Sequence, residues 1–361
     1  MTRLTVFAAL GLCASMVLAC YELVSTTTVS TTPRNWTGAG HFSIGNAVSR
    51  QAVGLAGQDI YGFHASGSVW SWSAPLLAKF GGPHTLTSIA QTHSLGHHEK
   101  LFVHGNRVGE TDNLDLLHAR SLNDLFSVVE AFDPTFWDAG TYHDLVEICD
   151  MAAVTLPEYG NPNDLSSHLF LSFRACARNG SGCSGGVLEV QVNAQVNKWW
   201  IRSSQEGGQV TNRKADGTRF SNECMPIAVT AYGDQSKDYL VVGDPSWDEL
   251  SVFDANRLWE GPLDSHRAPD SSRNIEDVHV EGRGDGGLDS VMLSVLWRGS
   301  SSAKLEHWAV LGGTFSASPF LVENLSSGVQ LISGLGLGAE GTTGDLFTFG
   351  NTVVRRHYQR D

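Results

Sequence analysis

The stretch Asp59-Ile-Tyr-Gly-Phe-His-Ala-Ser-Gly-Ser-Val-Trp-Ser-Trp, residues 59–72, decides the fold. It combines a short strand of β-branched and aromatic residues, a polar turn, and a second strand in which apolar and polar residues alternate. Related stretches recur at Lys100–Gly105, His168–Arg174, Asp238–Asp244, Asp289–Leu296 and Asp345–Asn351. Their uneven spacing of roughly 40 to 70 residues is typical of a repeat whose turns vary in length. The chain is therefore predicted to be all-β and built from one recurring unit.

Laid out in register, each unit contains up to four strands. One unit comprises Pro226–Tyr232, Tyr239–Gly243, Glu249–Phe253 and a short closing segment through Leu258 and Trp259. Recurring four-stranded units favour a β-propeller of about six blades. A seventh blade is possible if residues 123–150 form another unit. A β-sandwich also contains short alternating strands, but it gives no reason for one motif to recur six times.

The last unit contains only three strands, Val329–Ile332, Leu346–Phe349 and Thr352–Tyr358. An exposed sheet edge invites association with other chains, and propellers hide it by borrowing a strand from the other end of the chain. We predict that His41–Gly45 supplies the missing strand.

Composition limits the possible partners. The 39 Gly, 10 Trp and 16 Phe, with 17% charged residues, suit short strands and tight turns. The net charge of −14 argues against nucleic acid as a partner, because phosphate binding needs clustered Lys and Arg. We expect neither a metal nor a cofactor.

The N-terminus resembles an export signal. Residues 1–19 combine Arg3 with an apolar stretch, which is typical of a signal peptide. Val17-Leu-Ala-Cys20 also resembles a bacterial lipobox, so Cys20 is a candidate lipidation site, although ordinary signal peptidase could use the same residues. Residues 20–35 are rich in Ser and Thr and suit a tether, and residues 36–361 form the propeller domain. The protein is expected to be secreted or lipid-anchored at the cell envelope.

Export changes how the cysteines are interpreted. If Cys13 leaves with the signal and Cys20 is lipidated, Cys149, Cys176, Cys183 and Cys224 remain. An even number in an oxidising compartment favours disulfides. Four cysteines allow three pairings. A turn between Cys176 and Cys183 favours pairing these two, which leaves Cys149 with Cys224.

Motifs of common enzymes are missing. The chain has no His-Glu-x-x-His and no P-loop. This favours a non-catalytic binding protein, with a secreted glycoside hydrolase as one alternative and a protein-interaction scaffold as another. Sugars stack on aromatic rings and bond to charged or amide groups. The candidate ligand-binding residues are Trp70, Trp72, His118, Arg120, Trp199, Trp200, Trp259, His307, Trp308, Arg355, Arg356 and Tyr358.

Two family resemblances bear on this choice. Lys100–Gly105 followed by Asp115–Arg120, together with Leu346–Tyr358 and the blade ending Trp259-Glu-Gly-Pro, resembles fucose-lectin-type and related bacterial lectin propellers. This resemblance implies that the chain binds carbohydrate or a cell-surface glycoconjugate. Glu281–Asp289 resembles the calcium loop of integrin-type repeat propellers, but Arg283 stands where that loop needs a third carboxylate. A carboxylate-capped turn is therefore favoured over a calcium site.

Overall fold

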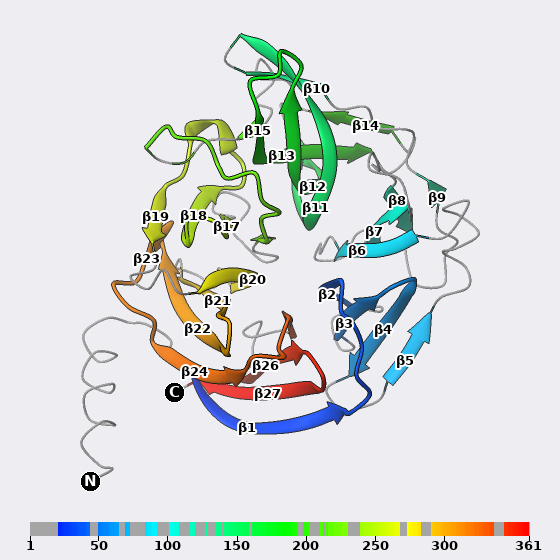
Figure 1. Cartoon of the computed structure of the whole chain (residues 1–361), viewed down its shortest axis with the longest axis vertical. Coiled ribbons are helices and arrows are strands. Elements are labelled where there is room, and N and C mark those ends of the chain that lie inside the picture. Colours follow the sequence, from blue (N-terminus) through cyan, green and yellow to red (C-terminus); the bar gives the residue numbers. More distant parts are fainter. Residues whose placement is uncertain are drawn as a thin grey trace.

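In the computed structural model, the strands of the chain are arranged radially as antiparallel sheets around one centre (Figure 1). The structure describes residues 21–43, 50–64, 69–72, 84–91, 101–107, 116–119, 127–128, 135–138, 140–158, 161–193, 198–201, 210–211, 214, 216–229, 239–267, 273–282, 290–335 and 343–360. The strands within these ranges form six sheets, which confirms a β-propeller. No helix in the same ranges is long and apolar enough to cross a membrane.

The first three blades follow the chain in order. Blade 1 contains β2 (Gly38–Ser43), β3 (Arg50–Ala56), β4 (Asp59–His64) and β5 (Val69–Trp72). Blade 2 contains β6 (His84–Gln91), β7 (Leu101–Arg107), β8 (Leu116–Ala119) and β9 (Ser127–Val128). Blade 3 contains β10 (Thr135–Asp138), β11 (Thr141–Glu158), β12 (Asn161–Ala177), β13 (Cys183–Asn193), β14 (Lys198–Ile201) and β15 (Val210–Thr211). The described strands between residues 123 and 150 thus belong to blades 2 and 3 rather than to a seventh blade.

The remaining blades complete the circle. Blade 4 contains β16 (Ile227–Val229), β17 (Tyr239–Asp244), β18 (Glu249–Asp254) and β19 (Asp264–Arg267). Blade 5 contains β20 (Asn274–Gly282), β21 (Ser290–Arg298), β22 (Ser302–Leu311), β23 (Thr314–Phe315) and β24 (Leu321–Ser326). Blade 6 contains β25 (Leu331–Leu335), β26 (Thr343–Phe349), β27 (Val353–Arg360) and β1 (Tyr21–Ser30). The closing segment predicted at Leu258 and Trp259 is instead a 3₁₀ turn, η2 (Leu258–Glu260), and β19 is the fourth strand of its blade.

The core lies between neighbouring blades, and the alternation of side chains along each strand explains it. All of β17 is buried. Its residues Leu240 and Val242 belong to the cluster shared with blade 3, whereas Tyr239 and Val241 belong to the cluster shared with blade 5. Because both faces of such a strand are covered, apolar residues occupy consecutive positions, which is the pattern that recurs along the chain.

An N-terminal strand closes the propeller, as predicted, but it is a different strand. β1 pairs antiparallel with β27, placing Leu23 opposite Tyr358 and Thr26 opposite Arg356. In Figure 1 this strand, in blue, lies along the outer side of the red β27. The Ser/Thr-rich segment expected as a tether therefore forms the outer strand of blade 6. The predicted donor, His41–Gly45, instead begins within β2, the inner strand of blade 1.

Trp36 seals the junction between blades 6 and 1. Its indole Nε1 donates a hydrogen bond to the carbonyl of Gly350 at 2.9 Å, and its ring packs edge-on against Phe349 with centroids 5.2 Å apart. A Cβ at Gly54 would lie 2.6 Å from the Trp36 ring, so only glycine leaves room for the indole. The connection from β1 to β2 is thereby fixed to both end blades.

The structure contains both expected disulfides. Cys176 and Cys183 face each other across the β12–β13 hairpin, and Cys149 of β11 is bonded to Cys224 before β16. The second bond therefore joins blade 3 to the entry of blade 4. Two disulfides are consistent with an oxidising compartment.

The two disulfides should differ in their contribution to stability. They are separated by 75 and 7 residues, and a crosslink restricts the unfolded chain more when its loop is longer. Replacing Cys149 and Cys224 by serine should lower the free energy of unfolding by about 4 kcal/mol, and replacing Cys176 and Cys183 by about 2 kcal/mol. Urea denaturation of both double variants measures the difference. Equal losses would contradict the loop-length argument.

Candidate functional site

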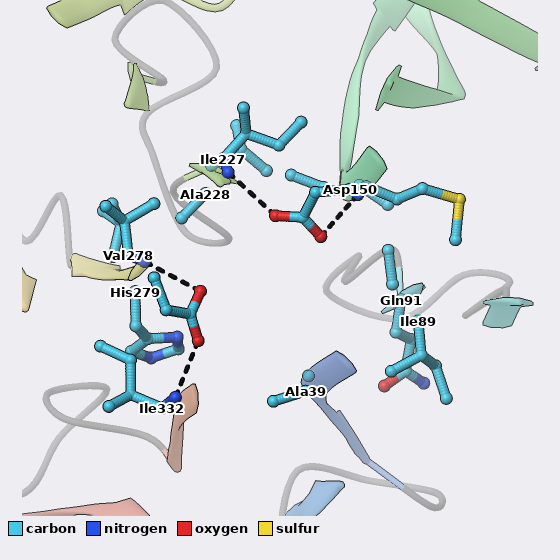
Figure 2. A pocket seen from close by; sticks show the side chains of 17 residues that line it. Ala39, Ile89, Gln91, Asp150, Ile227, Ala228, Val278, His279 and Ile332 are labelled. Carbon is cyan, nitrogen blue, oxygen red and sulfur yellow. Dashed lines mark hydrogen bonds between the residues drawn. The ribbon is translucent and has the colours of Figure 1, made fainter. Parts of the chain in front are cut away.

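A small cavity lies at the centre of the propeller. It has a volume of about 60 Å³ and is lined by the inner strands β2, β6, β11, β16, β20 and β25. Asp150, Asp277, His279 and Gln91 contribute its polar groups (Figure 2). Since one water needs about 10–15 Å³ and small-molecule pockets measure about 300–1,000 Å³, the cavity has room for a few waters but not for a sugar ring.

The two carboxylates of this cavity connect neighbouring blades. Asp150 accepts hydrogen bonds from the N–H of Met151 at 2.8 Å and from the N–H of Ile227, in blade 4, at 2.9 Å. Asp277 accepts in the same way from Val278 at 2.9 Å and from Ile332, in blade 6, at 2.7 Å. Figure 2 shows the carboxylate of Asp150 turned toward its backbone partners. Their contacts indicate a role in joining inner strands rather than in glycoside hydrolysis, for which two carboxyl groups must face a substrate.

Burial raises the pKa of both carboxyl groups. For Asp150 the loss of hydration outweighs the hydrogen bonds from Ile227, Met151 and Ser88, and its pKa is raised to about 6. For Asp277 the pKa lies well above its usual value, first through burial and then through the charge of Asp150. The folded protein thus holds protons at a pH where the unfolded chain has released them.

This difference predicts that stability falls with rising pH. An unfolded aspartate has a pKa of about 3.9, so between about pH 4 and pH 6 the folded state binds more protons at Asp150 and loses stability as the pH increases. The slope of unfolding free energy against pH, measured by urea denaturation, should become less negative in Asp150→Asn. The control is Asp216→Asn, since hydrogen bonds from Thr218 lower the pKa of this exposed carboxyl group and its contribution is lost as pH falls. An unchanged slope in Asp150→Asn would contradict the assignment.

Three of the predicted binding residues meet in a buried polar cluster centred on Glu323 of β24. Tyr358 and Arg356 donate hydrogen bonds to the two oxygens of Glu323, each at 2.6 Å. His307 lies on its other side, with Nε2 at 3.4 Å from Glu323 Oε1 and Nδ1 at 2.9 Å from Ser294 Oγ. Burial alone would raise the pKa of Glu323, but the hydrogen bonds from His307 and Tyr358 and the charge of Arg356 hold it below its usual range.

Ser294, His307 and Glu323 contain the residue types of a serine-hydrolase triad, but serine lies at Nδ1 and the acid at Nε2, the reverse of that triad, and all three lie inside the protein. Ser294 and His307 are both 0% exposed, and burial lowers the pKa of His307. A nucleophile must reach its substrate, and this serine is enclosed. The cluster therefore joins β22, β24 and β27 and stabilises the boundary between blades 5 and 6.

The other predicted residues lie in several places. Trp308 is buried in β22, where its Nε1 donates to Glu306 at 3.1 Å and its ring lies 4.4 Å from that of His266. Arg355 is paired with Asp345, with Nε at 2.9 Å from Oδ1. Strand β5 carries Trp70 and Trp72, β8 carries His118, β14 carries Trp199 and Trp200, and η2 carries Trp259, but their side chains lie outside the described residues. Arg120 and Cys20, with residues 283–289 of the calcium-like loop, lie entirely outside them.

Among the described residues, one potential metal-ligating group of three was found. It consists of Glu147, Cys149 and Cys224. The two cysteines are joined in a disulfide, so their sulfurs are not available as thiolate ligands. The described part of the chain therefore offers a crosslink at this place rather than a metal centre.

An exposed indole marks a different candidate site. Trp247 lies in the turn between β17 and β18, next to Asp248, whose positive φ of 51° gives this turn its shape. The residue is 44% exposed. Lys214 Nζ lies 4.2 Å from the centroid of its ring, and Arg267 Cζ lies 5.5 Å from it. The Lys214 side chain is only 4% exposed, whereas the indole beside it is 44% exposed.

Hydrogen bonds and charge hold this arrangement together. Arg267 Nε donates to the backbone carbonyl of Trp247 at 3.2 Å. Lys214 Nζ lies 3.4 Å from Glu249 Oε2. Cations beside an indole also stabilise its orientation. We call Trp247, Lys214, Arg267 and Glu249 the Trp247 surface, which joins a partly exposed indole to fixed polar groups.

This surface was not predicted from the sequence, because the candidate aromatic residues were those in third strands and at blade ends. Trp247 instead lies in Asp244-Pro-Ser-Trp-Asp-Glu249, a polar turn between two strands. A large aromatic residue in a turn has no neighbouring blade to pack against, and this was the available signal.

Comparisons with known proteins name no family for this chain. No family model and no curated protein matches the chain. Solved structures that are similar include a streptogramin B lyase, with 7% identity, a TM-score of 0.46 and coverage of 94% of this chain and 98% of that one. Virginiamycin B lyase from Staphylococcus aureus has 8% identity, a TM-score of 0.44 and coverage of 94% and 99%. BBS1N in complex with ARL6DN has 12% identity, a TM-score of 0.48 and coverage of 94% and 97%.

The six sheets of the chain themselves define its class as a β-propeller. At identities of 7% to 12% and TM-scores of 0.44 to 0.48, the similar structures add nothing to this assignment.

Proposed function

We propose that this protein is an exported, non-catalytic β-propeller that binds carbohydrate or a cell-surface glycoconjugate at the Trp247 surface. The observation that supports this most is the exposed indole of Trp247 beside Arg267, Lys214 and Glu249. The apolar C–H face of a sugar can stack on the indole while its hydroxyls bond to the charged groups. Because the central cavity is small and its carboxylates are bonded to backbone, the outer surface offers the better place for a saccharide.

Anchoring at Cys20 is part of this proposal. β1 begins at Tyr21, directly after this cysteine, so a lipid on Cys20 would hold the rim of blade 6 against the membrane without a flexible tether. Incorporation of labelled palmitate that is lost in Cys20→Ala would support lipidation. Unchanged incorporation in the variant would contradict it.

Replacing Trp247 by alanine should abolish most of the saccharide binding. Aromatic residues at the centre of a binding surface often contribute about 2 kcal/mol or more, so we expect affinity to fall at least about thirtyfold. A glycan array identifies a bound saccharide, and calorimetric titration of wild type and Trp247→Ala measures the loss. Thermal unfolding should be nearly unchanged because the residue is exposed.

The matched control is Tyr142→Ala, which removes another exposed aromatic side chain, 49% accessible, beside Arg178. It should leave the affinity unaltered. Equal affinity of wild type and Trp247→Ala would contradict the proposed site. If wild type bound no glycan at all, carbohydrate binding would be excluded and the protein-interaction scaffold favoured.

A further inference from the structure

Arg267 differs from most described arginines because no carboxylate among the described residues neutralises it. Arg174, Arg178, Arg298 and Arg356 each pair with an acidic residue at 2.6–2.8 Å. Arg267, which is exposed, forms no ion pair within the described part of the chain. A guanidinium that is kept free of protein carboxylates beside a candidate binding surface indicates a charged ligand.

The register of blade 4 shows why Glu249 does not pair with Arg267. Glu249 lies directly opposite Arg267 on the neighbouring strand. Its carboxylate instead approaches Lys214, which lies beneath the indole. Lys214 thus neutralises the acid that could otherwise pair with Arg267.

The orientation of Arg267 is also fixed. Its Nε donates to the carbonyl of Trp247, which holds the guanidinium 5.5 Å from the indole centroid. The two terminal nitrogens face no protein acceptor among the described residues and can donate two parallel hydrogen bonds to one anionic group. A ligand that contacts the exposed part of the Trp247 indole would bring its substituents within reach of this fork.

We infer that the Trp247 surface binds a saccharide that carries an anionic group, a carboxylate or a sulfate ester, with the sugar ring on Trp247 and the anion on Arg267. This inference rests on the proposed carbohydrate binding and adds the chemical class of the ligand. The protein carries a net charge of −14, which repels a long polyanion. Because screening limits this repulsion to about 8–10 Å at moderate salt, the surface suits a short anionic segment or a chain end.

The test compares oligosaccharides that differ only in charge. Uronic-acid trisaccharides, their methyl-esterified counterparts and sulfated trisaccharides are titrated into the whole protein by calorimetry. Wild type should bind at least one anionic form about tenfold more tightly than the neutral form. The preference of wild type for the anionic form should weaken as the salt concentration is raised from about 50 to about 500 mM. The carboxylate and sulfate arms show which anion is preferred.

Two variants separate the contributions. Arg267→Gln should bind charged and neutral forms equally, whereas Trp247→Ala should lose both. Arg257→Gln, which removes an exposed arginine paired with Glu260 at 3.4 Å, is the matched control and should keep the wild-type preference.

Each remaining outcome is decisive. Equal binding of charged and neutral forms by wild type would overturn this inference and leave the proposed function intact. If the wild-type protein bound none of these trisaccharides but bound an unrelated neutral glycan, this inference would also be overturned. Absence of all glycan binding would overturn both. An anionic preference that persists in Arg267→Gln would place the anion elsewhere and contradict the inference.

Discussion

Replacing Glu323 with leucine should lower the free energy of unfolding by about 3–5 kcal/mol. The substitution leaves Arg356 and Tyr358 in the boundary between blades 5 and 6 without their shared acceptor. The side chains of Glu323 and Arg356 are only 9% and 12% exposed, so water does not replace the lost bonds. Urea denaturation at pH 7 measures the change.

A surface pair provides the control for this prediction. Glu147 and Arg174 are bonded at 2.8 Å, but both side chains are about one-third exposed. Glu147→Leu should therefore cost about 1 kcal/mol or less. The double variant Glu323→Leu/Arg356→Met should recover part of the loss, because it removes the unpaired charge. Equal effects of the two single substitutions would show that the Glu323 cluster does not stabilise the blade boundary.

Deleting residues 21–30 should strongly destabilise the propeller. The deletion removes β1 and exposes the edge of β27 along the whole register from Tyr21 to Ser30. It also uncovers the cluster against which Leu23 packs, between blades 5 and 6. We expect a large decrease in melting temperature and a tendency to aggregate through the open edge. Circular dichroism and light scattering during heating measure both effects.

A peptide added in trans makes this prediction specific. The sequence YELVSTTTVS of β1 should restore part of the melting temperature when it is added to the truncated protein. A scrambled peptide of equal composition should not. A truncated protein that unfolds at the wild-type temperature would contradict closure by β1.

The inner and middle strands were predictable from sequence because both of their faces are buried. In β17 and β21, apolar residues follow one another in short runs bounded by turns. The pairing of Cys176 with Cys183 was favoured for a similarly local reason, since a single turn separates them.

The outer strands were not predictable in the same way. β1 is mostly exposed and consists largely of Ser and Thr, so it resembles a polar linker although threonine suits strands well. In blade 4, the polar strand β19 was missed in favour of the more apolar Leu258 and Trp259. An apolar pattern in the sequence indicates a buried strand. A strand at the rim of a blade is covered on one edge only, so its sequence does not show this pattern.

The candidate site depends on contacts that could not be predicted from the sequence. Lys214 and Trp247 are 33 positions apart, and their proximity follows from the packing of the blade 3–4 connection against the β17–β18 turn. The preference of Glu249 for Lys214 over Arg267 also appears only in three dimensions. In contrast, His307, Arg356 and Tyr358 have the residue types expected of a binding site, but their cluster is enclosed between blades.

Oxidative footprinting of Trp247 tests the proposed binding site most directly. Hydroxyl radicals modify exposed indoles, and mass spectrometry quantifies the modification in the peptide that contains Trp247. This peptide should be oxidised in the free protein, because Trp247 is 44% exposed, and should be protected at a saturating concentration of a bound anionic saccharide. The peptide that contains Tyr142 should be oxidised equally in both states. Unchanged oxidation of Trp247 at saturation would contradict carbohydrate binding at this surface.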